Sequence, residues 1–120
     1  MSSDNKRSIL LQLARDSIKE VLEAKSSIDK ASLIQEHPLL TQAVPTTINI
    51  YINNELRGSS KSQTKPSSLM DEIILNAKKA AFEDGSFLAL STSEYLKSEI
   101  EIILETPDGI ISEKDPAILQ

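Results

Sequence analysis

The stretch PTTINIYINNELRG, residues 45–58, decides the fold that this sequence predicts. The isoleucines in residues 48–52 alternate with more polar residues, which is the period of a strand with one buried face. Asn53-Asn54 can adopt positive φ angles, so the pair predicts a two-residue turn into a returning strand from residue 55 to about 59. Gly58 in that strand allows a bulge, or a close approach by another backbone or a ligand.

Two helices are predicted on either side of this hairpin. Apolar residues recur at steps of three and four over residues 6–25, which is typical of an amphipathic helix, and Asp4 is its predicted N-cap. A second helix over residues 68–83 has Ser67 or Ser68 as its N-cap and a stripe of alanines, which favours close packing against a sheet. Residues 28–44 predict only short helical turns.

The C-terminal part predicts a third strand. Ser91 to Glu94 fits a capping box for a short helix, and EIEIILET (99–106) alternates glutamate with apolar residues. Its acidic face is expected to be solvated or to protect a sheet edge, although paired carboxylates can also bind a cation. Asp108-Gly109 predicts a turn into a short last strand at 110–111.

These elements predict an α+β fold: one domain over residues 1–120, with a small, mainly antiparallel sheet and two main helices packed on one face. The apolar fraction of 39% is enough for one core. The chain has no cysteine, so it has no disulfide or thiol chemistry. No apolar run has the length of a membrane span or a signal peptide, so we expect a cytoplasmic protein that does not enter a membrane.

Charge argues against general nucleic-acid binding. The net charge is −5, and the imbalance lies after residue 93, where seven acids face two lysines. Phosphate contacts need clustered lysine and arginine, and aromatic residues for base stacking make up only 3% of the chain. The local exception is the segment 56–70, with three basic residues and no acidic one.

Three ordered blocks carry a family resemblance: NELRGSS (54–60), LMDEIILNAKKAAFEDGSF (69–87) and LSTSEYLKSEIEIILETP (90–107). Together they resemble the AMME-syndrome candidate-region family, also called AmmeMemoRadiSam system protein A, over roughly residues 6–107. The resemblance implies an α/β-type fold and no firmly assigned reaction. It also implies a protein partner, a Memo-like or radical-SAM protein.

The chain departs from that family in two ways. Where members carry Leu-Arg-Gly-Cys-Ile-Gly, this chain keeps Leu56-Arg57-Gly58 but continues Ser59-Ser60-Lys61, so a role that needs the cysteine does not carry over. Members usually continue into a second segment that completes the domain. The resemblance therefore implies a domain that is reduced at its C-terminus.

Arg57, Gly58, Ser59 and Lys61 are the candidate ligand-binding residues. Arg57 either pairs with a C-terminal acid beside a bulge glycine, or contacts an anion at the mouth of a cleft between sheet and helix. The 59–68 loop is either a solvated flexible loop or an anion site before a helix N-terminus. Its glycine spacing is not that of a P-loop.

We predict no catalytic residue, no cofactor and no metal site, because His37 is the single histidine and has no second ligand nearby in the sequence. The function predicted is a non-catalytic accessory or protein-interaction domain. The alternative is a small anionic-ligand-binding protein or enzyme that uses a cleft near Arg57 and the 59–68 loop.

Overall fold

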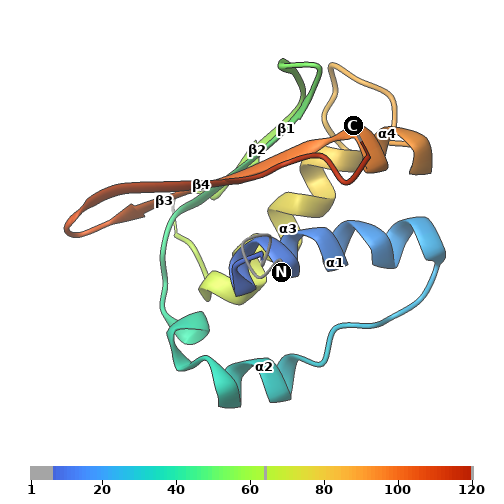
Figure 1. Ribbon diagram of the computed structural model, residues 1–120. Helices are drawn as coiled ribbons and strands as arrows, with labels where there is room; N and C mark the ends of the chain where they lie inside the picture. Colours follow the sequence, from blue (N-terminus) through green and yellow to red (C-terminus); the bar gives the residue numbers. More distant parts are fainter. Residues whose placement is uncertain (1–6, 64, 120) are drawn as a thin grey trace, which may run out of the picture.

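Four strands form one antiparallel sheet in the order β2-β1-β3-β4 (Figure 1). The computed structural model describes residues 7–63 and 65–119. Along the chain the elements are α1 (Ile9–Glu23), α2 (Lys30–Glu36), a 3₁₀ turn η2 (Pro38–Thr41), β1 (Thr46–Ile52), β2 (Glu55–Lys61), α3 (Leu69–Phe82), α4 (Thr92–Lys97), β3 (Glu99–Thr106) and β4 (Gly109–Asp115). The predicted α+β class is confirmed.

The core lies between one face of the sheet and helices α1 and α3. Ile48 and Ile50 of β1 lie opposite Ile102 and Ile100 of β3, and all four are fully buried. Fully burying one such side chain contributes about 1.5–3 kcal/mol. The apolar faces of α1 and α3 cover these residues, and Figure 1 shows both helices on the same side of the sheet. The prediction of two main helices on one face is thus confirmed.

The predicted turn and cap residues hold the element ends. Asn53 and Asn54 have φ angles of 53° and 64°, as the hairpin requires. Ser68 caps α3 by accepting a hydrogen bond from the backbone of residue 71, and Ser91 forms the predicted capping box with Glu94. Ser8 caps α1. The predicted cap Asp4 lies outside the described residues.

Two expectations about the strands were wrong, and for a third the structure excludes one of the alternatives. Strand β2 continues to Lys61, because it stays paired with β1 beyond Ser59, so the first residues of the predicted loop are strand residues. Strand β4 spans seven residues, since it pairs with β3 along its whole length. β3 is an inner strand of the sheet, so its glutamates do not protect an edge.

The segment before the sheet forms the short turns that its sequence predicts. α2 begins after Asp29, which caps it, and ends at Glu36. His37 follows, and the next residue, a proline, starts η2. Within the described residues, none of the helices combines the length and the apolar character needed to cross a membrane.

Candidate ligand site around Arg57

Arg57 is the extra residue of a β-bulge. Ile50 of β1 lies opposite Gly58, whereas its neighbour Tyr51 lies opposite Leu56, so Arg57 has no partner of its own in β1. A bulge bends the strand and redirects the side chain of the extra residue. Here the guanidinium group reaches the segment that connects α3 to α4.

Glu94 holds this guanidinium group in a two-point ion pair. Arg57 donates from Nε to Oε2 at 3.0 Å and from Nη2 to Oε1 at 3.1 Å. Nη2 also donates to the Leu88 carbonyl at 2.7 Å, and the Phe87 ring lies 5.2 Å from the guanidinium carbon. The hydrogen bonds from Arg57, with one from the Ser91 backbone, lower the pKa of Glu94. The predicted pairing of Arg57 with a C-terminal acid is confirmed.

Gly58 lies directly against the backbone of α3. A Cβ atom at this position would lie 2.1 Å from the carbonyl oxygen of Ala80, which is far inside van der Waals contact. The predicted close approach of another backbone is confirmed, and the bulge begins at the next residue toward the turn. Gly58 therefore sets the distance between the sheet and α3.

The three residues that replace the expected Cys-Ile-Gly motif have different environments. Ser59 donates its hydroxyl to Asn49 at 2.6 Å and its backbone N–H to Asp84 at 3.0 Å. Ser60 donates to Asn76 Oδ1 at 2.7 Å. Lys61 is exposed at the end of the strand. The structure thus places Gly58 and Ser59 against the end of α3, Arg57 against Leu88 and Glu94, and Lys61 farther along the strand.

Asp84 connects this strand to the end of α3. Backbone N–H groups of Ser86 and Ser59 donate to its carboxylate, and these bonds, with the nearby charge of Arg57, lower the pKa of Asp84. The Asp84 carboxylate therefore occupies the outward backbone N–H of β2 at Ser59.

The serines that follow β2 surround a buried carboxylate that the sequence analysis missed. Glu72 of α3 is 6% exposed and accepts from the Ser62 hydroxyl at 2.6 Å, the Ser67 backbone at 2.9 Å and Asn76 Nδ2 at 3.2 Å. Burial raises the pKa of Glu72, but the hydrogen bonds from Ser62, Ser67 and Asn76 outweigh it, so the pKa lies below its ordinary value. Much of the polar loop is therefore anchored to α3.

Among the described residues, the hollows on the helical side of the molecule lie away from Arg57, and two of them are the larger ones. One, of about 700 Å³, lies between α3 and the segment before α2 and includes Ile28, Lys30 and Lys78. The other, of about 390 Å³, lies beside α1 and α4 and includes Leu22 and Tyr95. In the described ranges, no group of three or more His, Cys, Asp or Glu side chains is arranged to hold a metal ion.

Comparison with known proteins identifies the family. The AMMECR1 family model matches residues 11–117, which is most of the chain. The chain belongs to the AMMECR1 family. The predicted resemblance is thereby confirmed, and two residues of the family motif that this chain keeps, Arg57 and Gly58, are the bulge residue and its paired neighbour.

A solved structure shows the same fold. The crystal structure of the uncharacterized protein PH0010 from Pyrococcus horikoshii superimposes on this AMMECR1 domain with a TM-score of 0.71 and 24% sequence identity. The match covers 82% of this chain and 50% of the other, so this chain spans about half the length of that relative. None of the curated proteins gives a match.

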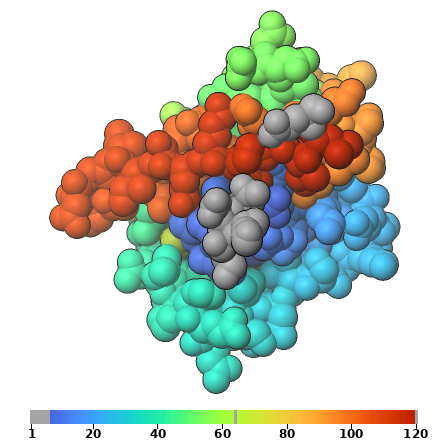
Figure 2. All heavy atoms as spheres, viewed as in Figure 1, coloured from blue at the N-terminus to red at the C-terminus, as the bar shows by residue number. Residues whose placement is uncertain are grey.

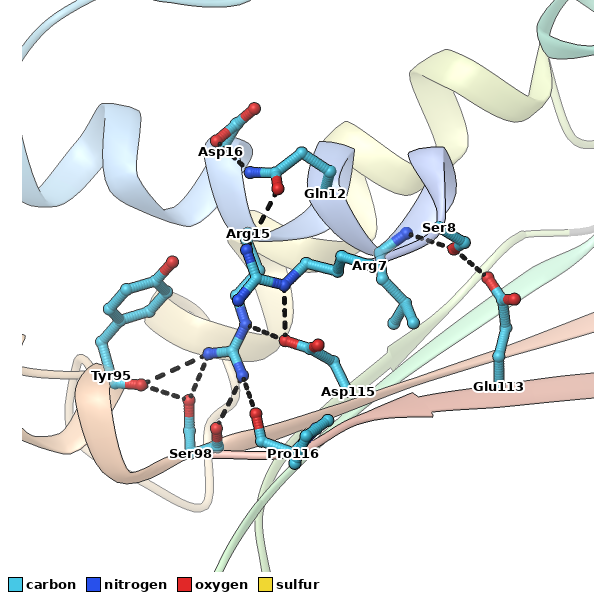
Figure 3. Close-up of polar contacts among 11 residues, drawn as sticks. Arg7, Ser8, Gln12, Arg15, Asp16, Tyr95, Ser98, Glu113, Asp115 and Pro116 are labelled. Atoms are coloured by element: carbon cyan, nitrogen blue, oxygen red, sulfur yellow. Dashed lines mark hydrogen bonds and ion pairs between the residues drawn. The ribbon is translucent and has the colours of Figure 1, made fainter. Parts of the chain in front are cut away.

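A second polar cluster in the AMMECR1 domain centres on Arg15, a fully buried residue of α1 (Figure 3). Arg15 donates from Nε to Asp115 at 2.7 Å and from Nη2 to the carbonyl oxygens of Ser98 and Pro116 at 2.9 and 3.0 Å. Arg7 also donates to Asp115, at 3.0 Å. Because Arg15 bonds to groups on β4 and at the start of β3, this cluster ties α1 to the C-terminal strands.

The sequence carried only part of the signal for this cluster. Arg15 lies four residues after Leu11 and three before Ile18, so helical spacing places it beside buried apolar residues. Its partner Asp115 lies 100 positions away, and nothing local indicates that pairing. Only the pairing of β4 with β3, which brings Asp115 opposite Ile100 on the core face, makes the contact possible.

Proposed function

We propose that this AMMECR1 domain is a non-catalytic accessory domain that acts by binding a protein partner. The observation that carries the proposal is a surface patch formed by Arg57, Phe87 and Leu88, called the Arg57 patch below. The Leu88 side chain is 88% exposed and Phe87 is 39% exposed. Arginine is enriched among protein-binding hot spots, and neighbouring exposed apolar residues mark interaction surfaces.

The patch is ordered as well as exposed. Arg57 fixes the backbone of Leu88 through its carbonyl oxygen and is itself fixed by Glu94. An apolar residue whose backbone is held in place before binding loses less conformational entropy when its side chain enters a partner's pocket. This preorganisation favours the patch as a binding surface.

The polar groups of the family motif support a structural role. The donors of Arg57 on Nε and Nη2 are bonded to Glu94 and Leu88, and the hydroxyls of Ser59 and Ser60 are bonded to Asn49 and Asn76.

By its family resemblance, the partner we propose is a Memo-like or radical-SAM protein, in the cytoplasm.

The test is affinity purification of the tagged protein from its native cells. We expect a stoichiometric partner with the wild type, and its loss with Leu88→Ser, because the substitution removes an apolar anchor worth about 1–3 kcal/mol. Leu75→Ser is the matched control, since Leu75 is 46% exposed on α3 outside the patch. A partner that Leu88→Ser retains, or one that both variants lose, contradicts the proposal.

A second candidate function is the binding of a small anion at Arg57 and the 59–68 segment. It is favoured by Arg57 Nη1, which is buried and has no hydrogen-bond partner among the described residues. An anion would bond to that donor and use the exposed Lys61. Phosphate, sulfate or a carboxylate should then raise the melting temperature, and Arg57→Ala with Lys61→Ala should abolish the rise. No rise with any of them contradicts this function.

A further inference from the structure

The two edges of the sheet differ in how they are protected. On β2 the bulge at Arg57 interrupts the edge, and the outward N–H of Ser59 is bonded to Asp84 at 3.0 Å. Bulges and such covering groups prevent an edge from pairing with another strand. On β4 the described part of the chain places nothing comparable over residues 109–112. The β4 edge is therefore the one open to pairing.

Hydrogen bonding shows which backbone groups of β4 face outward. The Glu105 N–H donates to Pro45 on the β1 side of β3 at 3.0 Å, so its neighbours Leu104 and Thr106 face β4. These two residues lie opposite Ile111 and Gly109. Because the direction alternates along a strand, the N–H and C=O groups of Ile110 and Ser112 point away from the sheet.

The same part of β4 carries exposed apolar side chains. Ile110 is 74% exposed and Ile111 is 53% exposed, although Ile111 lies on the core face opposite Leu104. Figures 1 and 2 show why: the end of the β3–β4 hairpin stands out from the rest of the molecule, beyond the helices. Neither face of this end is fully covered, so a partner strand would gain apolar contacts as well as backbone hydrogen bonds.

We propose that β4 pairs antiparallel with β4 of a second copy of this chain, about a two-fold axis at Ile111. In this register the two Ile111 side chains meet at the axis. Ile110 of each copy lies opposite Ser112 of the other, so the outward N–H and C=O groups of these two residues hydrogen-bond to each other. Symmetry makes this pair occur twice. The two sheets then form one continuous sheet. The open edge and its apolar residues are buried together.

Charge complementarity selects this register. It places Asp108 of each copy opposite Lys114 of the other, again twice by symmetry. Lys114 Nζ lies 3.2 Å from Glu99 within its own chain, and Asp108 adds a second carboxylate. A shift of the axis to Ser112 would instead place Ile110 opposite Lys114 and Ile111 opposite Glu113, so both isoleucines would face charged residues. A shift of the axis to Ile110 would place Asp108 opposite Ser112 and Ile111 opposite Gly109, so the charge pair and the contact between the two Ile111 side chains would both be lost.

This inference is independent of the proposed function. The Arg57 patch lies on the β2 edge near the β1–β2 turn, whereas Ile110 lies on the β4 edge near the β3–β4 turn. The two surfaces are at diagonally opposite corners of the sheet. A failure of one test therefore leaves the other unaffected.

Sedimentation velocity of the purified full chain over a range of concentrations tests the pairing. We expect a reversible dimer with a Kd on the order of 10 μM to 1 mM, the range of a small interface. Ser112→Pro removes an N–H that points outward, so every hydrogen bond between β4 and β3 is kept. The dimer should weaken about 10-fold or more, because symmetry removes two hydrogen bonds between the copies. Ser112→Ala keeps the N–H and should dimerise like the wild type. A wild type that stays monomeric at about 1 mM overturns the proposal.

A charge exchange tests the register, and melting curves confirm that each variant is folded. Lys114→Asp places two carboxylates opposite each other and should weaken the dimer. Adding Asp108→Lys restores the opposite charges and should recover it. A dimer that Ser112→Pro leaves intact overturns the pairing, and a double variant as weak as Lys114→Asp alone overturns the register.

Discussion

Gly58 is the residue at which this fold tolerates least change. Its Cα faces the carbonyl oxygen of Ala80, at a distance that leaves no room for a methyl group. A residue with a Cβ atom would push α3 away from the sheet, and with it the fully buried Ile73 and Ala77. Packing against a main-chain atom cannot be relieved by a rotamer change, so the strain must be taken up by the backbone.

We therefore expect Gly58→Ala to lower the free energy of unfolding by about 3 kcal/mol, measured by urea denaturation. Gly85→Ala is the matched control, because a Cβ atom there meets nothing within 4 Å. It should change the stability by less than about 1 kcal/mol. Equal stability of the two variants would show that α3 does not depend on the close approach at Gly58.

At the scale of elements, local patterns predicted what local forces determine. The alternation of isoleucines gave the face of β1, the Asn53-Asn54 pair gave its turn, and Ser68 and Ser91 gave two helix starts. In the candidate site, both the ion pair of Arg57 and the close approach at Gly58 were among the alternatives that the sequence allowed.

Elements that depend on distant contacts were not predictable. β4 lacks a strict alternation and is extended by its pairing with β3, and its last residue is held by Arg15 from the other end of the chain. In the same way, the serines after β2 were interpreted as solvated or anion-binding because nothing local shows that Glu72 is buried beneath them.

The free energy of unfolding should depend on pH through Glu72, which holds the segment between β2 and α3. Its pKa in the folded state lies below the ordinary value of 4.5, so ionised Glu72 stabilises the fold above that pH, and the contribution is lost as the pH falls through the folded-state value. Glu72→Gln should lower stability at pH 7 by about 1–3 kcal/mol, because an amide cannot accept all the bonds from Ser62, Ser67 and Asn76.

Urea denaturation of the wild type and Glu72→Gln between about pH 3 and 7 checks this, and we expect their difference in stability to shrink as the pH falls. The comparison isolates Glu72 because the other carboxyl groups are present in both proteins. Glu36→Gln, an exposed position on α2, is the control and should follow the wild type within about 0.5 kcal/mol. A difference that stays constant with pH would mean that the charge of Glu72 does not stabilise the fold.

At the scale of the whole molecule, the buried Arg15 cluster joins the two ends of the described chain. Arg15 from α1 contacts Ser98 at the start of β3 and Asp115 at the end of β4 (Figure 3). The last part of β4 is therefore fixed to the helical layer, whereas its first part extends into solvent. The open edge is therefore confined to the hairpin end of β4, because the Arg15 cluster holds the rest of the strand in place.

Removing the Asp115 carboxylate should weaken the attachment of the last part of β4 to α1. Asp115→Ala leaves the fully buried guanidinium of Arg15 without its ion partner, which should cost about 3–5 kcal/mol of unfolding free energy. Arg7→Ala removes the other, partly exposed partner of Asp115 and should cost less than about 1 kcal/mol. Urea denaturation gives both values. Hydrogen exchange should show faster exchange of the β3–β4 amides in Asp115→Ala alone, because the end of β4 then loses its ion pair with α1. If Asp115→Ala and Arg7→Ala lowered the free energy of unfolding by the same small amount, the carbonyl groups around Arg15 would be enough to hold it. The ion pair would then not be what fixes β4.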